Sequence, residues 1–173
     1  MRILMVVAPR NFRDEELLVP KQLFESKGWT VQIASKNLRP GEFATGMLGA
    51  KVRADLDILQ AKTKDYDAVI FVGGSGSTVF HNDQNAHMLA FQAYDTGKVT
   101  AAICAATSTL ANARVLVGKK ATGWPSEREN ITAKSAGYTG EDVTVTGKVV
   151  TGKGPASARK FAEAIAKLLE QKS

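Results

Sequence analysis

The sequence predicts an α/β domain with a mostly parallel central sheet and helices on both faces of that sheet. Short apolar runs rich in Val and Ile alternate with segments whose apolar side chains recur at helical spacing. The 173 residues are enough to bury such a three-layer core as one domain, residues 1–173, and no linker, repeat or low-complexity tract divides them.

The first half of the chain follows this alternation, apart from a less regular region between residues 36 and 65. A fully apolar strand after that region ends in two glycines. The expected elements are a strand at 2–8, a helix at 14–28 ended by Gly28, a strand at 29–35, a short strand and turn at 51–58, a brief helix at 59–65, a strand at 66–74 and a helix around 84–96.

The second half continues with one more buried strand, which leads straight into a helix. The segments DVTVTG and KVVTGKG predict an antiparallel hairpin that turns at Gly147 and Lys148. The other expected elements are a strand at 98–104, a helix at 108–116, a segment at 119–124 followed by a polar connection, and a closing helix at 157–172.

Composition narrows the class of protein. The net charge is +6, but the basic residues are scattered and are not gathered with aromatic residues, so we expect no nucleic-acid partner. No segment approaches the roughly 18 apolar residues of a membrane helix, so we expect a cytoplasmic protein without a membrane partner. The single cysteine excludes an internal disulfide. The chain has two histidines, His81 and His87, and with the cysteine they form no spaced cluster that would suggest a metal site. The sequence implies no cofactor.

The cysteine stands where a strand meets a helix. Open parallel sheets bind ligands at the carboxyl ends of their strands, and Cys104 lies at such an end, in the position of a nucleophile elbow. The helix that follows would favour the thiolate, and the backbone amides of Gly74 and Ala105 could hold an oxyanion. The alternative is a small buried hydrophobic side chain, which is a common state of a free cysteine.

Three acidic residues begin the first helix, at the same sheet edge as Cys104. A carboxyl group of Asp14, Glu15 or Glu16 could share a proton with the thiolate if burial raises its pKa. Acidic residues are also common in the first turn of any helix, because they interact favourably with the helix dipole. The residues alone leave the choice among the three open.

The chain resembles the DJ-1/ThiJ/PfpI superfamily from its first strand to its last helix. The residues that carry the resemblance are Glu16 four positions before Pro20, the pair Gly73-Gly74, AAIC at 101–104, TGWP at 122–125, and TGKGPASARKFAEAI at 151–165. The resemblance implies a flavodoxin-like three-layer sandwich of the class I glutamine amidotransferase type. It also implies a homodimer or a higher homo-oligomer.

The resemblance further implies roles for individual residues. In the superfamily, the glutamate that matches Glu16 is protonated and hydrogen-bonds the cysteine sulfur, so Cys104 and Glu16 are the expected catalytic pair. Gly74 and Ala105 would supply the backbone amides. The other residues expected to line the pocket are Gly73, Thr78, His81, Trp124, Gly154 and Pro155.

The chain departs from the superfamily's patterns at a few positions. Protease-like PfpI members carry a histidine directly after the cysteine and a glutamate after the Gly-Gly loop, where this chain has Ala105 and, by spacing, Thr78. The DJ-1 branch has alanine after the cysteine, as here, but a histidine where this chain has Trp124, whose indole cannot act as a base. We therefore place the chain closer to the DJ-1/ThiJ branch. Trp124 would either roof the pocket or pack at a subunit contact.

Three functions are compatible with these residues. The first is an enzyme in which the Cys104 thiolate adds to a small reactive carbonyl, as in a glyoxalase or deglycase, while Glu16 shuttles the proton. The second is a non-enzymatic stress protein in which Cys104 is oxidised and alters partner binding or chaperone activity. The third and weakest is an amidase or peptidase. The expected partner is accordingly a small electrophile or an oxidant.

Overall fold

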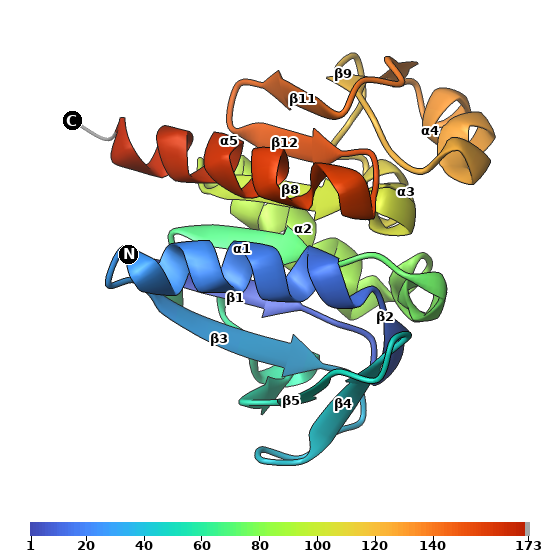
Figure 1. The fold of residues 1–173 in the computed structure, drawn as a ribbon. Coiled ribbons are helices and arrows are strands. Elements are labelled where there is room, and N and C mark those ends of the chain that lie inside the picture. Colours follow the sequence, from blue (N-terminus) through green and yellow to red (C-terminus); the bar gives the residue numbers. More distant parts are fainter. Residues whose placement is uncertain (172–173) are drawn as a thin grey trace.

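The computed structural model describes residues 1–171 and confirms the predicted fold class, a mostly parallel sheet covered by helices on both faces (Figure 1). The main sheet has seven strands in the order β11-β12-β8-β7-β1-β3-β6, and all neighbours are parallel except β11 and β12. These strands are β1 (Arg2–Val6), β3 (Thr30–Ser35), β6 (Leu56–Asp57), β7 (Ala68–Phe71), β8 (Val99–Ile103), β11 (Val143–Thr146) and β12 (Val149–Gly152).

Four helices cover the two faces of this sheet. Helices α1 and α5 lie side by side over one face, while α2 and α3 pack on the other (Figure 1). The central strands are apolar on both sides, because successive side chains of a strand point to opposite faces: Leu4 joins one buried cluster and Met5 the other. The helices are α1 (Asp14–Ser26), α2 (Gln84–Asp95), α3 (Thr107–Asn112) and α5 (Ala158–Glu170).

Turn residues end several elements where the sequence predicts. Gly28 has a φ of 77°, and the Trp29 amide donates to the Phe24 carbonyl, which closes the last turn of α1. The antiparallel hairpin forms as predicted, with Thr146 opposite Val149. The closing helix ends at Glu170 in the structure, and the last residue predicted for it, Lys172, lies outside the described residues.

The irregular region 36–65 agrees with the prediction in part. The short strand predicted within 51–58 forms, and two 3-10 turns stand where a brief helix is predicted at 59–65, but the strand at 43–46 and the sheet that it joins are not predicted. A small second sheet pairs β2 with β4 and β4 with β5, and two 3-10 turns follow it. This sheet depends on a tertiary contact, because the Asp14 carboxylate accepts hydrogen bonds from two amides of the β4–β5 turn at 2.9 and 2.8 Å. The elements are β2 (Arg10–Phe12), β4 (Phe43–Gly46), β5 (Lys51–Arg53), and the turns at Ile58–Gln60 and Thr63–Asp65.

The segment after α3 also differs from the prediction. The helix predicted at 108–116 stops at Asn112, because Arg114 takes a φ of 66° that a helix cannot accommodate. The polar connection is not all loop, since it holds a helix between two short parallel strands. These elements are β9 (Lys120–Ala121), a 3-10 turn at Pro125–Glu127, α4 (Arg128–Ala133) and β10 (Gly137–Tyr138).

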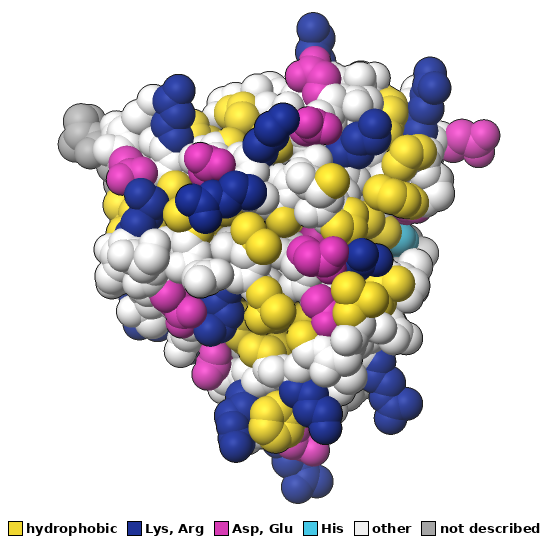
Figure 2. All heavy atoms as spheres, in the orientation of Figure 1, with side chains coloured by type: hydrophobic (Ala, Val, Ile, Leu, Met, Phe, Trp, Pro, Cys, Tyr) yellow, Lys and Arg dark blue, Asp and Glu magenta, His cyan; other side chains and the backbone are white. Residues whose placement is uncertain are grey.

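Charged side chains of both signs share the surface. On the face shown in Figure 2, basic side chains are interspersed with acidic ones, and apolar side chains show between them. Ion pairs such as Lys160–Asp142 and Lys21–Glu25, both at 2.9 Å, reflect this mixing. Within residues 1–171, no helix combines the length and the apolar character needed to cross a membrane.

The packing of α1 can be tested by truncating a buried ring. Phe24 lies on the buried face of α1 and is fully buried, so we expect Phe24→Ala to lower the free energy of unfolding by about 3–5 kcal/mol in urea denaturation. Phe91 on α2 is 44% exposed, and Phe91→Ala should cost less than about 1 kcal/mol. Equal losses in the two variants would contradict this packing.

Candidate active site at Cys104

Cys104 occupies a strained bend between β8 and α3. It follows directly on β8, begins a 3-10 turn at Cys104–Ala106, and has a φ of 63°, in the left-handed region that residues other than glycine rarely adopt. The Trp124 amide donates to the Cys104 carbonyl at 3.2 Å and helps to hold the turn. Strain of this kind persists only where surrounding structure enforces it, and it gathers at functional sites.

Glu16 lies beneath this bend. Its side chain is 0% exposed, and neither carboxyl oxygen makes a hydrogen bond of standard geometry with any of residues 1–171. The polar groups that interact with the carboxyl are the Cys104 thiol and the Gly73 amide. Burial is the dominant effect and raises the pKa of Glu16 to about 7, against the smaller lowering by these two contacts. The carboxyl can therefore both accept and donate a proton near neutral pH.

The three acids at the start of α1 have three different surroundings. Asp14 is occupied by the backbone amides of the β4–β5 turn. Glu15 forms a two-point contact with the Arg13 guanidinium, at 2.9 and 3.0 Å. Glu16 is the one of the three that interacts with the Cys104 thiol. The fold thus brings to the sulfur the same acid that the family resemblance selects.

The Cys104 thiol is not a resting thiolate. Burial, followed by the negative charge of Glu16, raises the pKa of the thiol to about 12, while hydrogen bonds from the Ala105 and Gly74 amides lower it. The amides therefore favour the thiolate, in the direction expected from the sequence, but burial and the charge of Glu16 outweigh them. Two groups this close titrate as a pair, so a thiolate forms when the Cys104 proton passes to Glu16.

The two glycines after β7 allow this close approach. A Cβ atom on Gly73 would meet the Glu16 carboxyl, and it would lie 2.6 Å from the Ile103 carbonyl oxygen and 2.7 Å from the Cys104 Cβ. Gly74 has a φ of 107°, which disfavours any side chain at that position. The glycine pair therefore has a steric reason at both positions.

A pocket of about 410 Å³ opens above Cys104. Trp124 is one of its walls, and the indole ring lies against Gly154, where a Cβ atom would be 2.7 Å from the ring carbon Cζ3. Trp124 therefore lines the pocket, as one of the two expectations has it. The expected residues that line the pocket are Cys104, Gly74, Thr78, Ala105, Trp124 and Pro155.

Three residues expected in the lining lie outside it. Gly73 is behind Glu16 and Cys104, and Gly154 is behind the Trp124 ring. His81 points to the backbone, with its Nε2 atom 2.9 Å from the Ala105 carbonyl oxygen. It therefore supports the turn after the cysteine and does not line the pocket.

Other residues complete the lining without having been expected from the sequence. Ser126 and Glu127 directly follow TGWP, and Arg13 precedes the three acids, so adjacency in the chain is the signal that points to them. Met47 has no such signal, because its place depends on how the small sheet packs against α1. These additional lining residues are Arg13, Met47, Ser75, Ser126 and Glu127.

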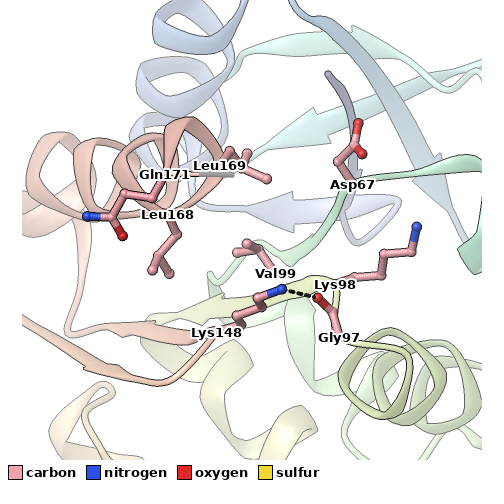
Figure 3. Close-up of a pocket in the computed structure, with 8 residues that line it drawn as sticks. All are labelled: Asp67, Gly97, Lys98, Val99, Lys148, Leu168, Leu169 and Gln171. Carbon is pink, nitrogen blue, oxygen red and sulfur yellow. Dashed lines mark hydrogen bonds between the residues drawn. The ribbon is translucent and has the colours of Figure 1, made fainter. Parts of the chain in front are cut away.

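A second pocket lies at the opposite edge of the sheet (Figure 3). Its volume is about 390 Å³, and its lining contains no cysteine, histidine or hydroxyl side chain. The Lys148 amine in this lining donates a hydrogen bond to the Gly97 carbonyl at 3.0 Å. Because ligands of parallel sheets bind at the carboxyl ends of strands, the Cys104 pocket is the candidate active site. Across residues 1–171, no three His, Cys, Asp or Glu side chains are grouped to hold a metal ion. The second pocket is lined by Asp67, Gly97, Lys98, Val99, Lys148, Leu168, Leu169 and Gln171.

The burial of Glu16 predicts a pH-dependent stability. Its pKa rises from 4.5 to about 7 on folding, so the neutral form stabilises the fold below about pH 4.5, and this contribution is lost as the pH rises through 7. Between those limits, the free energy of unfolding should fall by on the order of 3 kcal/mol relative to Glu16→Gln, which cannot ionise. Urea denaturation across this range measures the difference. The exposed control Glu25→Gln should follow the wild type, and a wild-type profile parallel to that of Glu16→Gln would contradict the assignment.

Comparisons with known proteins identify the family of the chain. A model of the DJ-1/PfpI family matches residues 1–168. An uncharacterised protein of Methanocaldococcus jannaschii is 40% identical over 173 residues, which covers 98% of this chain and 83% of that protein. A protein of Pyrococcus horikoshii named as a deglycase is 28% identical over 170 residues, covering 98% of this chain and 100% of the relative.

Solved structures show the same fold. A ThiJ/PfpI domain protein from Brachyspira murdochii superposes with a TM-score of 0.95 at 32% identity, covering 99% of this chain and 98% of that one. Drosophila melanogaster DJ-1beta has a TM-score of 0.87 at 28% identity, with coverage of 99% and 91%. The family model and these relatives span nearly the whole chain, and the chain therefore belongs to the DJ-1/PfpI family.

Proposed function

We propose that this chain is a cysteine-dependent enzyme that acts on small reactive carbonyls, in the manner of a glyoxalase or deglycase. The observation that carries the proposal is the buried Glu16 carboxyl, with a pKa of about 7, in contact with the Cys104 thiol at the base of a pocket. A relative named as a deglycase, from Pyrococcus horikoshii, supports the same class of substrate.

The pair can perform carbonyl addition without another base. The thiol proton passes to the Glu16 carboxylate as the sulfur attacks the carbonyl carbon, and the C=O electron pair moves onto oxygen. Glu16 then returns the proton to that oxygen, which gives a hemithioacetal and regenerates the carboxylate. The Gly74 and Ala105 amides, which donate toward the sulfur, are placed to stabilise the negative charge during the step.

Two features favour this reaction over the other candidates. A peptidase of the PfpI type uses a histidine directly after the cysteine, but the residue after Cys104 is Ala105, and the His81 ring is turned to a backbone carbonyl. A redox sensor typically presents a solvent-exposed cysteine, whereas Cys104 is 7% exposed. A proton relay to a buried carboxyl fits addition to a bound carbonyl better than either.

Consumption of methylglyoxal tests the proposal. We expect the wild type to consume it and Cys104→Ala to abolish turnover, because the nucleophile is lost. Glu16→Gln should lower kcat/KM by about 10²–10⁴-fold, as expected for removal of a general acid–base group. Glu25→Gln, an exposed change on the same helix, should behave as wild type. Turnover by Cys104→Ala at the wild-type rate would end the proposal.

A further inference from the structure

The pocket above Cys104 has two charged side chains in its lining, and their surroundings differ. The Arg13 guanidinium is held by both oxygens of Glu15, at 2.9 and 3.0 Å, so its charge is largely offset within the protein. Glu127 forms no ion pair with any residue in the described range 1–171. Of the charged side chains in the lining, Glu127 is therefore the one without an ion pair among residues 1–171, and its charge is negative.

The Glu127 carboxylate is fixed in place by two hydroxyl groups. Ser108 donates to one oxygen at 2.7 Å, and Ser126 donates to the other at 2.6 Å. Ser108 is 1% exposed and lies on α3, the helix that begins just after Cys104, so a buried hydroxyl on the nucleophile's own helix positions this carboxylate. Each carboxylate oxygen accepts more than one hydrogen bond, and acceptor sites stay open for a ligand.

The other lining residues strengthen the preference for a cationic ligand that the Glu127 carboxylate creates. Met47, Trp124 and Pro155 supply apolar walls, and an ion pair is stronger in a less polar setting than in bulk water. An ammonium or guanidinium group at this wall would make charge-assisted hydrogen bonds to Glu127. The Trp124 ring adds a face that attracts cations. An anionic ligand would instead be repelled.

We propose that Glu127 is the specificity-determining residue of this pocket and that it selects substrates bearing a positive charge, namely carbonyl adducts of amines or guanidines that keep an ammonium or guanidinium group beside the reacting carbon. The choice of substrate rests on the proposed function, whereas the charge preference of the pocket can be measured without turnover. The Cys104 sulfur attacks the carbonyl carbon of the adduct, whose C=O electron pair moves onto oxygen, and Glu127 binds the cationic part of the same molecule.

Charged thiol reagents test this preference directly, because Cys104 is the single cysteine of the chain. A methanethiosulfonate transfers its sulfenyl group to the Cys104 sulfur: an S–S bond forms, the bond to the sulfonyl group breaks, and methanesulfinate leaves. The cationic trimethylammonioethyl and anionic sulfonatoethyl reagents are compared by intact-protein mass spectrometry. We expect the wild type to react faster with the cation, and Glu127→Gln to lower the cation-to-anion rate ratio by about tenfold or more.

Matched variants distinguish an effect of the Glu127 carboxylate in the pocket from an effect of the net charge of the protein. Glu129→Gln changes the net charge equally at an exposed site that does not line the pocket, and it should leave the ratio within about twofold of wild type. Glu127→Asp keeps the charge and should keep most of the preference. Circular dichroism checks that each variant is folded. Equal ratios in Glu127→Gln and Glu129→Gln, or an unchanged ratio in folded Glu127→Gln, would overturn the proposal.

Turnover provides the second measurement. The methylglyoxal adduct of N-acetylarginine amide is cationic, and that of N-acetylcysteine amide is neutral. Glu127→Gln should raise KM about tenfold for the first with little change in kcat, and should raise KM much less for the second, which has no cationic group to lose its partner. Equal KM changes for the two adducts would contradict the proposal. If the wild type consumes neither adduct nor methylglyoxal, the proposed function fails, and the reagent ratio still decides the role of Glu127.

Discussion

The contact between the Glu16 carboxyl and the Cys104 thiol constrains the rest of this structure. Two ionisable groups are buried against each other, and the carboxyl has no hydrogen bond of standard geometry to offset the loss of water. Burial of the pair costs less when both groups are neutral, and this is why the pKa values of Glu16 and Cys104 are both raised. Proton exchange within the pair is also what the proposed chemistry requires.

The fold brings the pair together by joining three strand ends at one edge of the sheet. The loop after β1 leads through β2 to α1, which carries Glu16. Gly73 and Gly74 follow β7, and Cys104 directly follows β8. The left-handed backbone at Cys104 and the missing side chain at Gly73 are local departures from ordinary strand and helix geometry. Both departures serve the same contact.

The sequence predicts the framework better than the pocket. Val- and Ile-rich runs identify the buried strands, and Gly28 marks the end of α1, because these signals are local. The small sheet of β2, β4 and β5 is not predictable in this way, since it depends on Asp14 reaching amides far along the chain. Met47 enters the pocket through that contact. His81 is the opposite case. Its place in the sequence suggests a residue that lines the pocket, but its ring is hydrogen-bonded to the Ala105 carbonyl.

The most direct test of this account is the protonation state of Glu16 itself. Infrared difference spectroscopy of wild type against Glu16→Gln isolates the C=O band of the protonated Glu16 carboxyl, and the band can be followed as the pH is raised. The account predicts that the band persists well above pH 4.5 and disappears with a midpoint at about 7. Loss of the band near pH 4.5, the ordinary value for a glutamate, would contradict it.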